Sequence, residues 1–574
     1  MNDAFAKQMS DGYALDQPAV LLGSPMLDNE LYNDSHVQVA LSILNRHGLI
    51  AGATGTGKTK TLQVMAGELS KAGVPCFVAD IKGDVTGMAA AGDATNAIVS
   101  QRMQSLNIPF VPSAHPVEFL SLSGKRGAQV RATVHSFGPL LLGKVLDLNE
   151  TQTSILTLIF KYCDDNSYPL LDLKDLAETL KYLSSDDGKG ALADYGGMSA
   201  ASVGVLLRSI IVLEQQGADI FFGEPQFDVM DLLRTTPDGQ GVVSLLELSD
   251  VMDQPALFST FMLWMLAQLY ETLPEVGDLP KPKLCFFFDE AHLLFDSASQ
   301  ALLDEIERTA RLIRSKGVGV YFVTQAPTDV PSSVLSQLGN RVQHALRAFT
   351  PEDADALRKT ARTFPMTDFY DVEKLLTSLG IGEAAVTVLS PRGIPTPLAA
   401  TRLVAPDSQM SPIADEQFAS LVAASPLTAK YGATIDRASA YEMIQARLEA
   451  ARVQAMTAKV QAQQAAAAQA GATTAAVPGA PGAPAGQVLL TPAQQRAEIQ
   501  RQVREQREAE KAAERERKAE AAAAKKAAAD QARAERDRQR AINSTIRAGE
   551  HMATSRLGQD VIRGVFGTLF GGKK

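Results

Sequence analysis

The chain has 574 residues, of which 45% are hydrophobic and 21% are charged, and its formal net charge is −10 at pH 7. This length is too great for a single hydrophobic core and predicts about two to four domains. The acidic balance excludes a surface that is basic throughout and binds nucleic acid everywhere, although it permits a basic channel inside a ring.

The cysteines and the N-terminus indicate where the protein works. Cys76, Cys163 and Cys285 lie far apart in the sequence, and this spacing fits neither a disulfide framework nor a zinc site. Residues 1–17 are polar and lack the basic and apolar regions of a signal peptide, and no apolar stretch is long enough to span a bilayer. We therefore expect a cytoplasmic protein without an integral membrane segment.

Residues 1–47 contain two short apolar runs, at 19–22 and 37–39. These runs predict edge strands that precede a nucleotide-binding domain. The segment is too short for a large separate domain.

The central motif is GATGTGKT at 52–59, which satisfies the phosphate-loop pattern GxxxxGK[ST] in full. A strand is expected at 48–51 and a helix at 60–69, so the loop would lie at a helix N-terminus that attracts phosphate. Lys58 would reach the β- and γ-phosphates of ATP, and Thr59 would offer its hydroxyl to Mg²⁺. The alternative is a chance glycine-rich turn. The predicted nucleotide-binding residues are Gly52, Ala53, Thr54, Gly55, Thr56, Gly57, Lys58, Thr59 and Lys60.

Residues 74–80 form an apolar run that ends in an acid and predicts a buried parallel strand, with a turn at 81–84. Ligands bind at the carboxyl ends of such strands, so Asp80 and Asp84 could face a metal ion or water. They could equally cap a helix.

Between 115 and 235 the alternation of strands and helices is interrupted. Residues 117–134 predict a β-hairpin with a basic tip, and helical patterns follow at 149–162, 172–183 and 199–216. We interpret the whole as an inserted helical subdomain. Lys125, Arg126 and Arg131 could contact a phosphate backbone, or they could belong to a solvated turn.

The nucleotide-binding core resumes with a strand at 241–248 and an apolar helix at 255–273. A hydrophobic strand at 283–288 then runs into Asp289 and Glu290, as a Walker B element does. Asp289 would hold Mg²⁺ through water, and Glu290 would polarise the attacking water as general base. The alternative is a strand end with incidental acids.

A helix at 299–315 carries Arg308, Arg311 and Arg314, and a buried strand follows at 317–324. Gln325 ends that strand, where it could sense the γ-phosphate or the attacking water, or simply cap the next turn. Further strands are expected at 340–347, 382–389 and 398–404, the last two at a sheet edge or as a C-terminal strap.

The composition changes beyond 410. We expect a helical extension at 411–469, an Ala/Pro/Gly linker at 470–490 and a charged helix or weak coiled coil at 491–545. The basic residues of that helix could contact nucleic acid or only be solvated. Residues 546–574 carry apolar side chains at helical spacing, which could dock on a neighbouring subunit, a protein partner or a membrane surface.

The motifs GATGTGKT, DIKGD, FFFDEAH, GVGVYFVTQAP and GEAAV together resemble the HerA/FtsK superfamily of ring-forming P-loop ATPases over residues 45–404. The stretch from Val117 through GPLLLGKVLDLNETQT to the DEAH strand is similar to bacterial HerA-like proteins of the YjgR type. This resemblance implies an α/β fold with a RecA-like core at 48–410, interrupted by the helical insertion and followed by a long helical tail.

The resemblance further implies a hexamer with ATP between subunits and DNA in the pore. A neighbour's arginine would complete each site, with Arg314 as the first candidate and Arg46 as the second; either could instead form a structural ion pair. Residues 1–47 are too short for the N-terminal barrel of HerA, so its nuclease partnership does not carry over. The membrane helices and winged domain of FtsK are also not expected.

Two functional readings remain from the sequence. The first is an ATP-hydrolysing ring motor, a DNA translocase or helicase-like ATPase. The second is a nucleotide-switched assembly factor whose tail recruits a protein partner, with a protein-translocating ATPase as a further possibility within the motor class.

Overall fold

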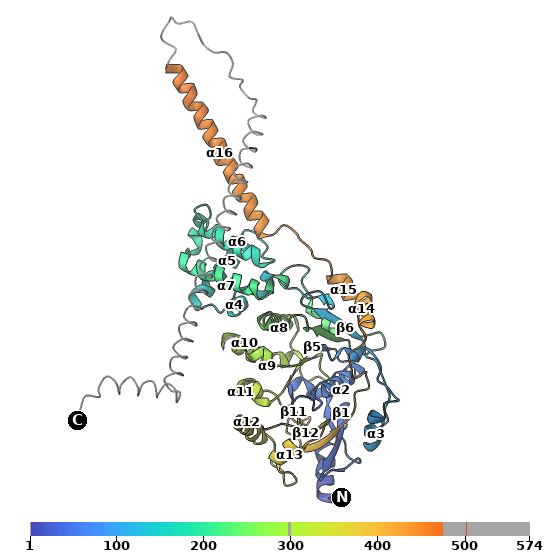
Figure 1. Ribbon diagram of the computed structural model, residues 1–574. Coiled ribbons are helices and arrows are strands. Elements are labelled where there is room, and N and C mark those ends of the chain that lie inside the picture. Colours follow the sequence, from blue (N-terminus) through green and yellow to red (C-terminus); the bar gives the residue numbers. More distant parts are fainter. Residues whose placement is uncertain (1, 297–299, 474–500, 502–574) are drawn as a thin grey trace, which may run out of the picture. The chain divides into compact units, whose positions relative to one another are not determined.

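The computed structural model describes residues 2–296, 300–473 and 501 (Figure 1). The chain divides into two compact units, the first ending at Gln445 and the second beginning at Ala446. The linker and tail expected beyond 473 lie outside the described residues, apart from Arg501. Among the described residues, no helix combines the length and the apolar character needed to cross a lipid bilayer.

The first unit is built on one mixed sheet, which confirms the α/β class. The described strands are β1 (Ala19–Leu27), β2 (Glu30–Leu31), β3 (Val37–Ala40), β4 (Gly48–Ala51), β5 (Cys76–Asp80), β6 (Val117–Ser121), β7 (Ala128–Gln129), β8 (Val243–Glu247), β9 (Leu284–Phe288), β10 (Val318–Thr324), β11 (Asn340–His344), β12 (Glu383–Thr387) and β13 (Ala399–Leu403). Their order is β2-β1-β13-β12-β11-β4-β10-β9-β5-β8-β6-β7, with β3 paired to β1.

The middle of the sheet is parallel, from β11 through β4, β10, β9 and β5 to β8. Strands β4, β5, β8, β9 and β10 are buried along their whole length, which explains their nearly continuous apolar sequences. Because all five run in one direction, their carboxyl ends meet at one edge of the sheet.

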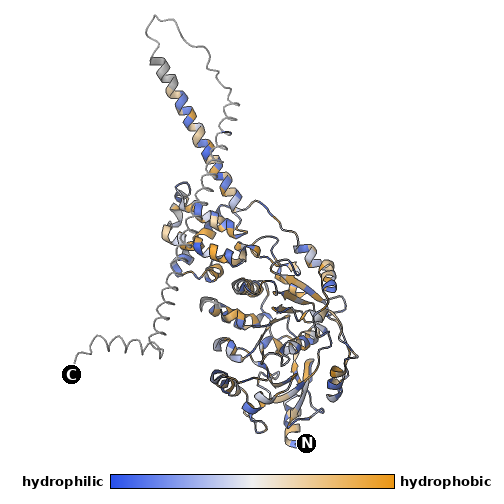
Figure 2. Ribbon diagram, viewed as in Figure 1, coloured by the Kyte–Doolittle hydropathy of each residue, from blue (hydrophilic) through white to orange (hydrophobic). Residues whose placement is uncertain are grey.

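Helices cover both faces of this parallel region (Figures 1 and 2). All the described α-helices of the chain are α1 (Asp3–Tyr13), α2 (Lys58–Lys71), α3 (Ala97–Ser105), α4 (Val134–Val145), α5 (Glu150–Asp165), α6 (Leu173–Ser184), α7 (Ala200–Gln215), α8 (Pro255–Thr272), α9 (His292–Asp296), α10 (Gln300–Ile313), α11 (Ser332–Leu335), α12 (Pro351–Ala361), α13 (Val372–Ser378), α14 (Asp415–Ala424), α15 (Pro426–Tyr431) and α16 (Ala440–Thr473), of which α2 and α8 lie on opposite faces of the sheet.

Alternate strand residues face the two layers, as the period of a β-strand requires. Leu62 and Met65 of α2 share one core cluster with Phe287, which stacks on Tyr321 of the next strand at 5.1 Å between ring centroids. On the other face, Phe77 packs against Phe261 of α8. The sheet is therefore held between α2 and α8.

The strands expected at 382–389 and 398–404 are β12 and β13, and they do not form the edge of the sheet. β12 pairs with β11 and β13, but β13 is not terminal, because β1 from the N-terminal segment pairs with it through Ser24 and Arg402. The N-terminal strands thus extend the same sheet. This long-range pairing leaves no local signal in the sequence.

The hairpin expected at 117–134 is wrong. β6 and β7 are parallel neighbours, with Leu120 opposite Ala128, and α4 begins at Val134. Two of the three basic side chains are also engaged within the chain: Arg126 pairs with buried Glu247, and Arg131 donates to the carbonyl of Tyr431 at 2.8 Å. Of this basic group, Lys125 alone remains exposed without a partner of opposite charge among the ion pairs of the described residues.

Residues 411–445 belong to the first compact unit, beyond the boundary expected at 410. Phe418 of α14 packs on Phe119 of β6 with ring centroids 4.4 Å apart. The hydroxyl of Ser425 donates to the carboxylate of Glu118, and Tyr431 of α15 packs on Phe227. These contacts bury the aromatic side chains of a segment that composition alone assigned to the tail.

Candidate nucleotide-binding site

The phosphate loop connects β4 to α2 at the carboxyl edge of the parallel strands. Gly52 has φ 154° and Gly57 has φ 112°, values at which a side chain would be strained. A Cβ on Gly52 would also lie 2.4 Å from the Cβ of His344. Two backbone hydrogen bonds fix the loop. Gly52 N–H donates to the carbonyl of Thr324 at 3.2 Å, and Ala53 N–H donates to the carbonyl of Ala345 at 2.8 Å.

Lys58 lies in this loop and is almost fully buried. Its ammonium donates to the carbonyls of Gly52 at 2.7 Å and Ala53 at 3.3 Å. Burial lowers its pKa, although the nearby Glu290 and Asp289 oppose that effect. An ammonium so placed is ready to exchange carbonyl oxygens for phosphate oxygens.

Thr59 and Lys60 occupy the first turn of α2, and both are half-buried. The side chain of Lys60 donates to the carbonyl of Met410 and so is engaged by the segment that precedes α14. Its backbone N–H lies in the helix N-terminal turn, which is the part of Lys60 available to a phosphate.

Thr61 and His344 contact each other beside the phosphate loop, and no sequence motif marks either residue. The Thr61 hydroxyl and His344 Nε2 are 2.9 Å apart. Burial and the charge of Lys58 lower the pKa of His344 to about 4, while backbone groups of Thr56 and Glu383 oppose the shift. His344 is therefore neutral near pH 7.

Asp289 follows β9, and its carboxylate meets those of Asp80 and Asp84, with one oxygen of each within 4.8 Å of the others. Burial, Glu290 and the two aspartates raise the pKa of Asp289 to about 7. Three clustered oxygen donors beside the hydroxyl-bearing first turn of α2 suit a hard cation such as Mg²⁺.

Asp80 ends β5, and its carboxylate holds the turn that follows rather than the first turn of a helix. Its carboxylate accepts backbone N–H bonds from Gly83 at 2.8 Å and Val85 at 2.9 Å, which fixes the turn after β5. It is also a member of the acidic cluster, and burial and the charge of Glu247 raise its pKa to about 7.

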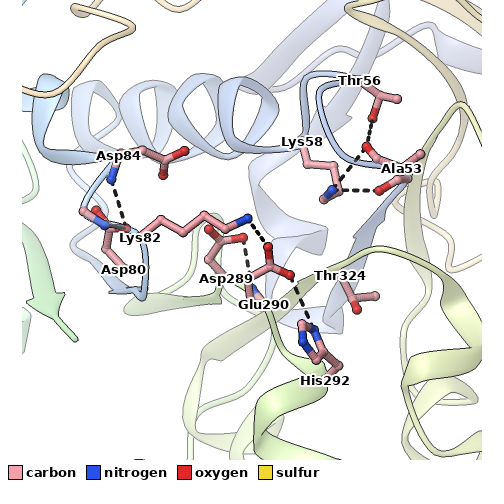
Figure 3. A network of polar contacts seen from close by, with 12 residues as sticks. Ala53, Thr56, Lys58, Asp80, Lys82, Asp84, Asp289, Glu290, His292 and Thr324 are labelled. Carbon is pink, nitrogen blue, oxygen red and sulfur yellow. Dashed lines mark hydrogen bonds and ion pairs between the residues drawn. The ribbon is translucent and has the colours of Figure 1, made fainter. Parts of the chain in front are cut away.

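Glu290 lies next to Asp289 with a left-handed backbone, φ 47°, which is uncommon for a residue with a side chain. Its carboxylate pairs with Lys82 and lies 3.4 Å from His292 Nδ1 (Figure 3). Burial raises the pKa of Glu290, but the hydrogen bond and charge of Lys82, together with the charges of Lys58 and His292, leave that pKa lowered. The sequence pattern predicts the turn that carries Lys82 but no role for Lys82 itself.

Gln325 is exposed immediately after β10, the strand between β4 and β9. The turn beyond it is fixed by Asp329, which accepts from the Thr324 hydroxyl at 2.7 Å and from Ala326 N–H at 2.8 Å. The structure thus places Gln325 on the same edge of the sheet as the phosphate loop and the acids.

Arg46 and Arg314 lie at the opposite edge of the sheet from the phosphate loop. Arg46 precedes β4 and Arg314 precedes β10, so both are at the amino ends of strands whose carboxyl ends carry the site. His47, also at that edge, accepts from Val320 N–H at 3.0 Å and its Nε2 lies 2.6 Å from the Ala310 carbonyl. His47 therefore links the start of β4 to the C-terminal part of α10, next to the two arginines.

A complete phosphate loop between a buried strand and a helix, with an acid pair on a neighbouring strand, defines a P-loop nucleotide-binding protein. Within that class, the chain belongs to the family described as Helicase HerA-like C-terminal, whose model matches residues 26–487.

Two curated relatives are DNA double-strand break repair helicases HerA. The one from Sulfurisphaera tokodaii is 23% identical over 361 residues, which is 62% of this chain and 64% of the relative. The one from Sulfolobus acidocaldarius is 22% identical over 356 residues, 61% of this chain and 64% of the relative. The chain thus spans less than two thirds of the length of these relatives.

Among solved structures, the plasmid coupling protein TrwB in complex with ADP and Mg²⁺ is 14% identical, with 71% of this chain and 93% of that chain covered and a TM-score of 0.46. VirB4 of Thermoanaerobacter pseudethanolicus is 13% identical, with coverages of 68% and 98% and a TM-score of 0.41.

Proposed function

We propose that the protein is a cytoplasmic, ATP-hydrolysing ring motor that translocates along or unwinds DNA. Lys58 and the loop amides hold the phosphates, and Glu290 takes the proton of the attacking water. Thr59 and Asp289 hold Mg²⁺, which neutralises phosphate charge when bound. Gln325 contacts the γ-phosphate or the attacking water. The three free, buried cysteines support the reducing location.

The observation that carries this proposal is the separation of the arginines from the loop within one chain. The seven residues of β10 span roughly 23 Å, which lies between Arg314 on one edge and Gln325 on the other. Arg314 therefore cannot reach the phosphates of its own loop. We propose that in the closed ring the amino edge of one subunit faces the carboxyl edge of the next, so that each Arg314, with Arg46 beside it, completes a neighbour's site.

The ring size and the cargo are part of the same proposal. We propose six subunits and DNA in the pore, supported by membership of a helicase family and by the similarity to repair helicases. The net acidic charge restricts DNA to an internal surface rather than the whole exterior. A protein partner would bind through the tail.

The test is the ATP hydrolysis rate with and without double-stranded DNA at low salt. If DNA stimulates hydrolysis and added salt weakens that stimulation, the result supports a DNA-coupled motor. A Glu290→Gln control should bind ATP but lose about 100-fold or more in kcat, because general-base catalysis is removed. Hydrolysis that is indifferent to single- and double-stranded DNA across low salt would contradict the DNA cargo. It would favour the nucleotide-switched assembly factor or the protein-translocating ATPase.

A further inference from the structure

Lys82 forms an ion pair with the general base of the proposed reaction. Its ammonium contacts Glu290 Oε1 across the space between the turn after β5 and the end of β9 (Figure 3). The Glu290 side chain is 7% exposed and that of Lys82 is 46% exposed. One partner is thus buried and the other is open to solvent, so the pair can open by movement of Lys82 alone.

The turn that carries Lys82 is built to hold it in place. Asp80 accepts backbone N–H bonds from Gly83 and Val85, on the C-terminal side of Lys82, and so fixes the path of the turn. The same turn places a carboxylate oxygen of Asp84 within 4.8 Å of one of Asp289. The turn after β5 therefore touches both members of the acid pair, Lys82 on Glu290 and Asp84 on Asp289.

We infer that Lys82 is a positioning residue that holds Glu290 in a resting, paired state, and that hydrolysis requires this pair to open. The inference rests on the proposed ATPase function and assigns its regulation to a residue of the same site. A carboxylate bound to an ammonium is a weaker base and is directed away from a water molecule that it must polarise. Opening the pair frees Glu290 without any rearrangement of β9.

Charged groups on each neighbouring element act on Glu290. Lys82 lies on the turn after β5, Lys58 on the phosphate loop, His292 on α9, and Asp289 precedes Glu290 in the chain. Among these cations, Lys82 donates a hydrogen bond to Glu290 Oε1. Substitution of Lys82 therefore leaves that carboxylate oxygen without this donor.

The experiment compares Lys82→Gln with Lys82→Arg in the full chain. Without DNA, Lys82→Gln should raise kcat for ATP severalfold with little change in KM, so that the ratio of DNA-stimulated to basal rate falls. Lys82→Arg keeps a cation that can pair with Glu290 and should return basal kcat toward the wild-type value. Lys7→Gln removes an exposed pair with Asp11 on α1 and serves as the matched control.

A second readout needs no hydrolysis. In thermal unfolding of the nucleotide-free protein, Lys82→Gln should lower Tm, because it leaves a buried carboxylate unpaired. In a Glu290→Gln background the same substitution should have a much smaller effect. Equal effects in both backgrounds would show that the pair is absent and would overturn the inference.

An unchanged or lowered basal kcat in Lys82→Gln, with an active wild type, would also overturn the inference while leaving the proposed function intact. If the wild type, Lys82→Gln and Glu290→Gln all hydrolyse ATP at the same background rate, the proposed function fails and the inference falls with it.

Discussion

Arg46 and Arg314 are like-charged neighbours at the amino edge of the parallel strands. Burial and then the charge of Arg46 lower the pKa of Arg314, while the charge of Asp278 opposes the shift. The repulsion between the two arginines is unfavourable by itself. An anion brought by a second subunit would relieve the repulsion, which is the electrostatic reason to place this edge against a neighbour's phosphates.

We predict that Arg314 acts in trans. Arg314→Ala should reduce kcat by about 1,000-fold, the usual value of an arginine that stabilises the transition state. Mixing Arg314→Ala with Lys58→Ala subunits should restore part of the ATPase, because a Lys58-bearing loop then meets an intact Arg314. Steady-state hydrolysis of mixed rings, verified by tagged co-purification, measures this recovery. No recovery in verified mixed rings would remove Arg314 from the site.

Asp289 should determine the Mg²⁺ requirement. Asp289→Asn removes the charge of a buried carboxylate that would hold the ion through water, so the Mg²⁺ concentration for half-maximal ATPase should rise about 10- to 100-fold. The comparison is a Mg²⁺ titration at fixed ATP. Asp34→Asn changes an exposed aspartate of the N-terminal segment and should leave the titration unchanged.

Gly52 should not tolerate a side chain. Gly52→Ala combines a left-handed backbone with a Cβ 2.4 Å from His344, so we expect a loss of about 1–3 kcal/mol in stability and weaker ATP binding. Chemical denaturation and a fluorescent-nucleotide titration measure the two effects. Gly277→Ala is the control, because its Cβ would meet no atom within 4 Å. Equal behaviour of the two variants would contradict the loop geometry.

His47 should make the protein less stable at acid pH. Burial, and less strongly the charge of Arg314, lower its pKa from 6.5 to about 4, although the Ala310 carbonyl opposes the shift. Between these values the unfolded chain binds a proton that the folded chain does not. The free energy of unfolding therefore keeps its full value above about pH 6.5 and falls as pH drops toward 4. His47 accounts for at most about 3 kcal/mol of this decrease.

The measurement is Tm as a function of pH for the wild type and His47→Gln. Asp80 and Asp289, whose pKa values are raised to about 7, contribute in the opposite direction, so the difference between the two proteins isolates His47. That difference should shrink as pH falls from 6.5 to 4. His36→Gln, at an exposed position, should run parallel to the wild type. A constant difference for His47→Gln would refute the assignment.

The sequence predicted the parts of this protein that depend on local pattern. Continuous apolar runs predicted the buried strands β4, β5, β8, β9 and β10, because a strand covered on both faces has no polar side. The phosphate-loop glycines and the acids after β9 were recognisable because their spacing is fixed by backbone geometry and by the ligands that they contact. The helical patterns expected at 149–162 and 172–183 correspond to α5 and α6, and the structure shows Asn149 and Asp172 as their N-caps.

Tertiary structure alone decided the rest. The pairing of β6 with β8, the place of β13 inside the sheet and the packing of α14 depend on partners far away in the sequence, for which no local rule exists. The same holds for the pair of Lys82 with Glu290 and for the neighbourhood of Arg46 and Arg314. A sequence pattern specifies which side chains stand at the end of a strand, whereas the order of strands in the sheet determines which of those ends meet.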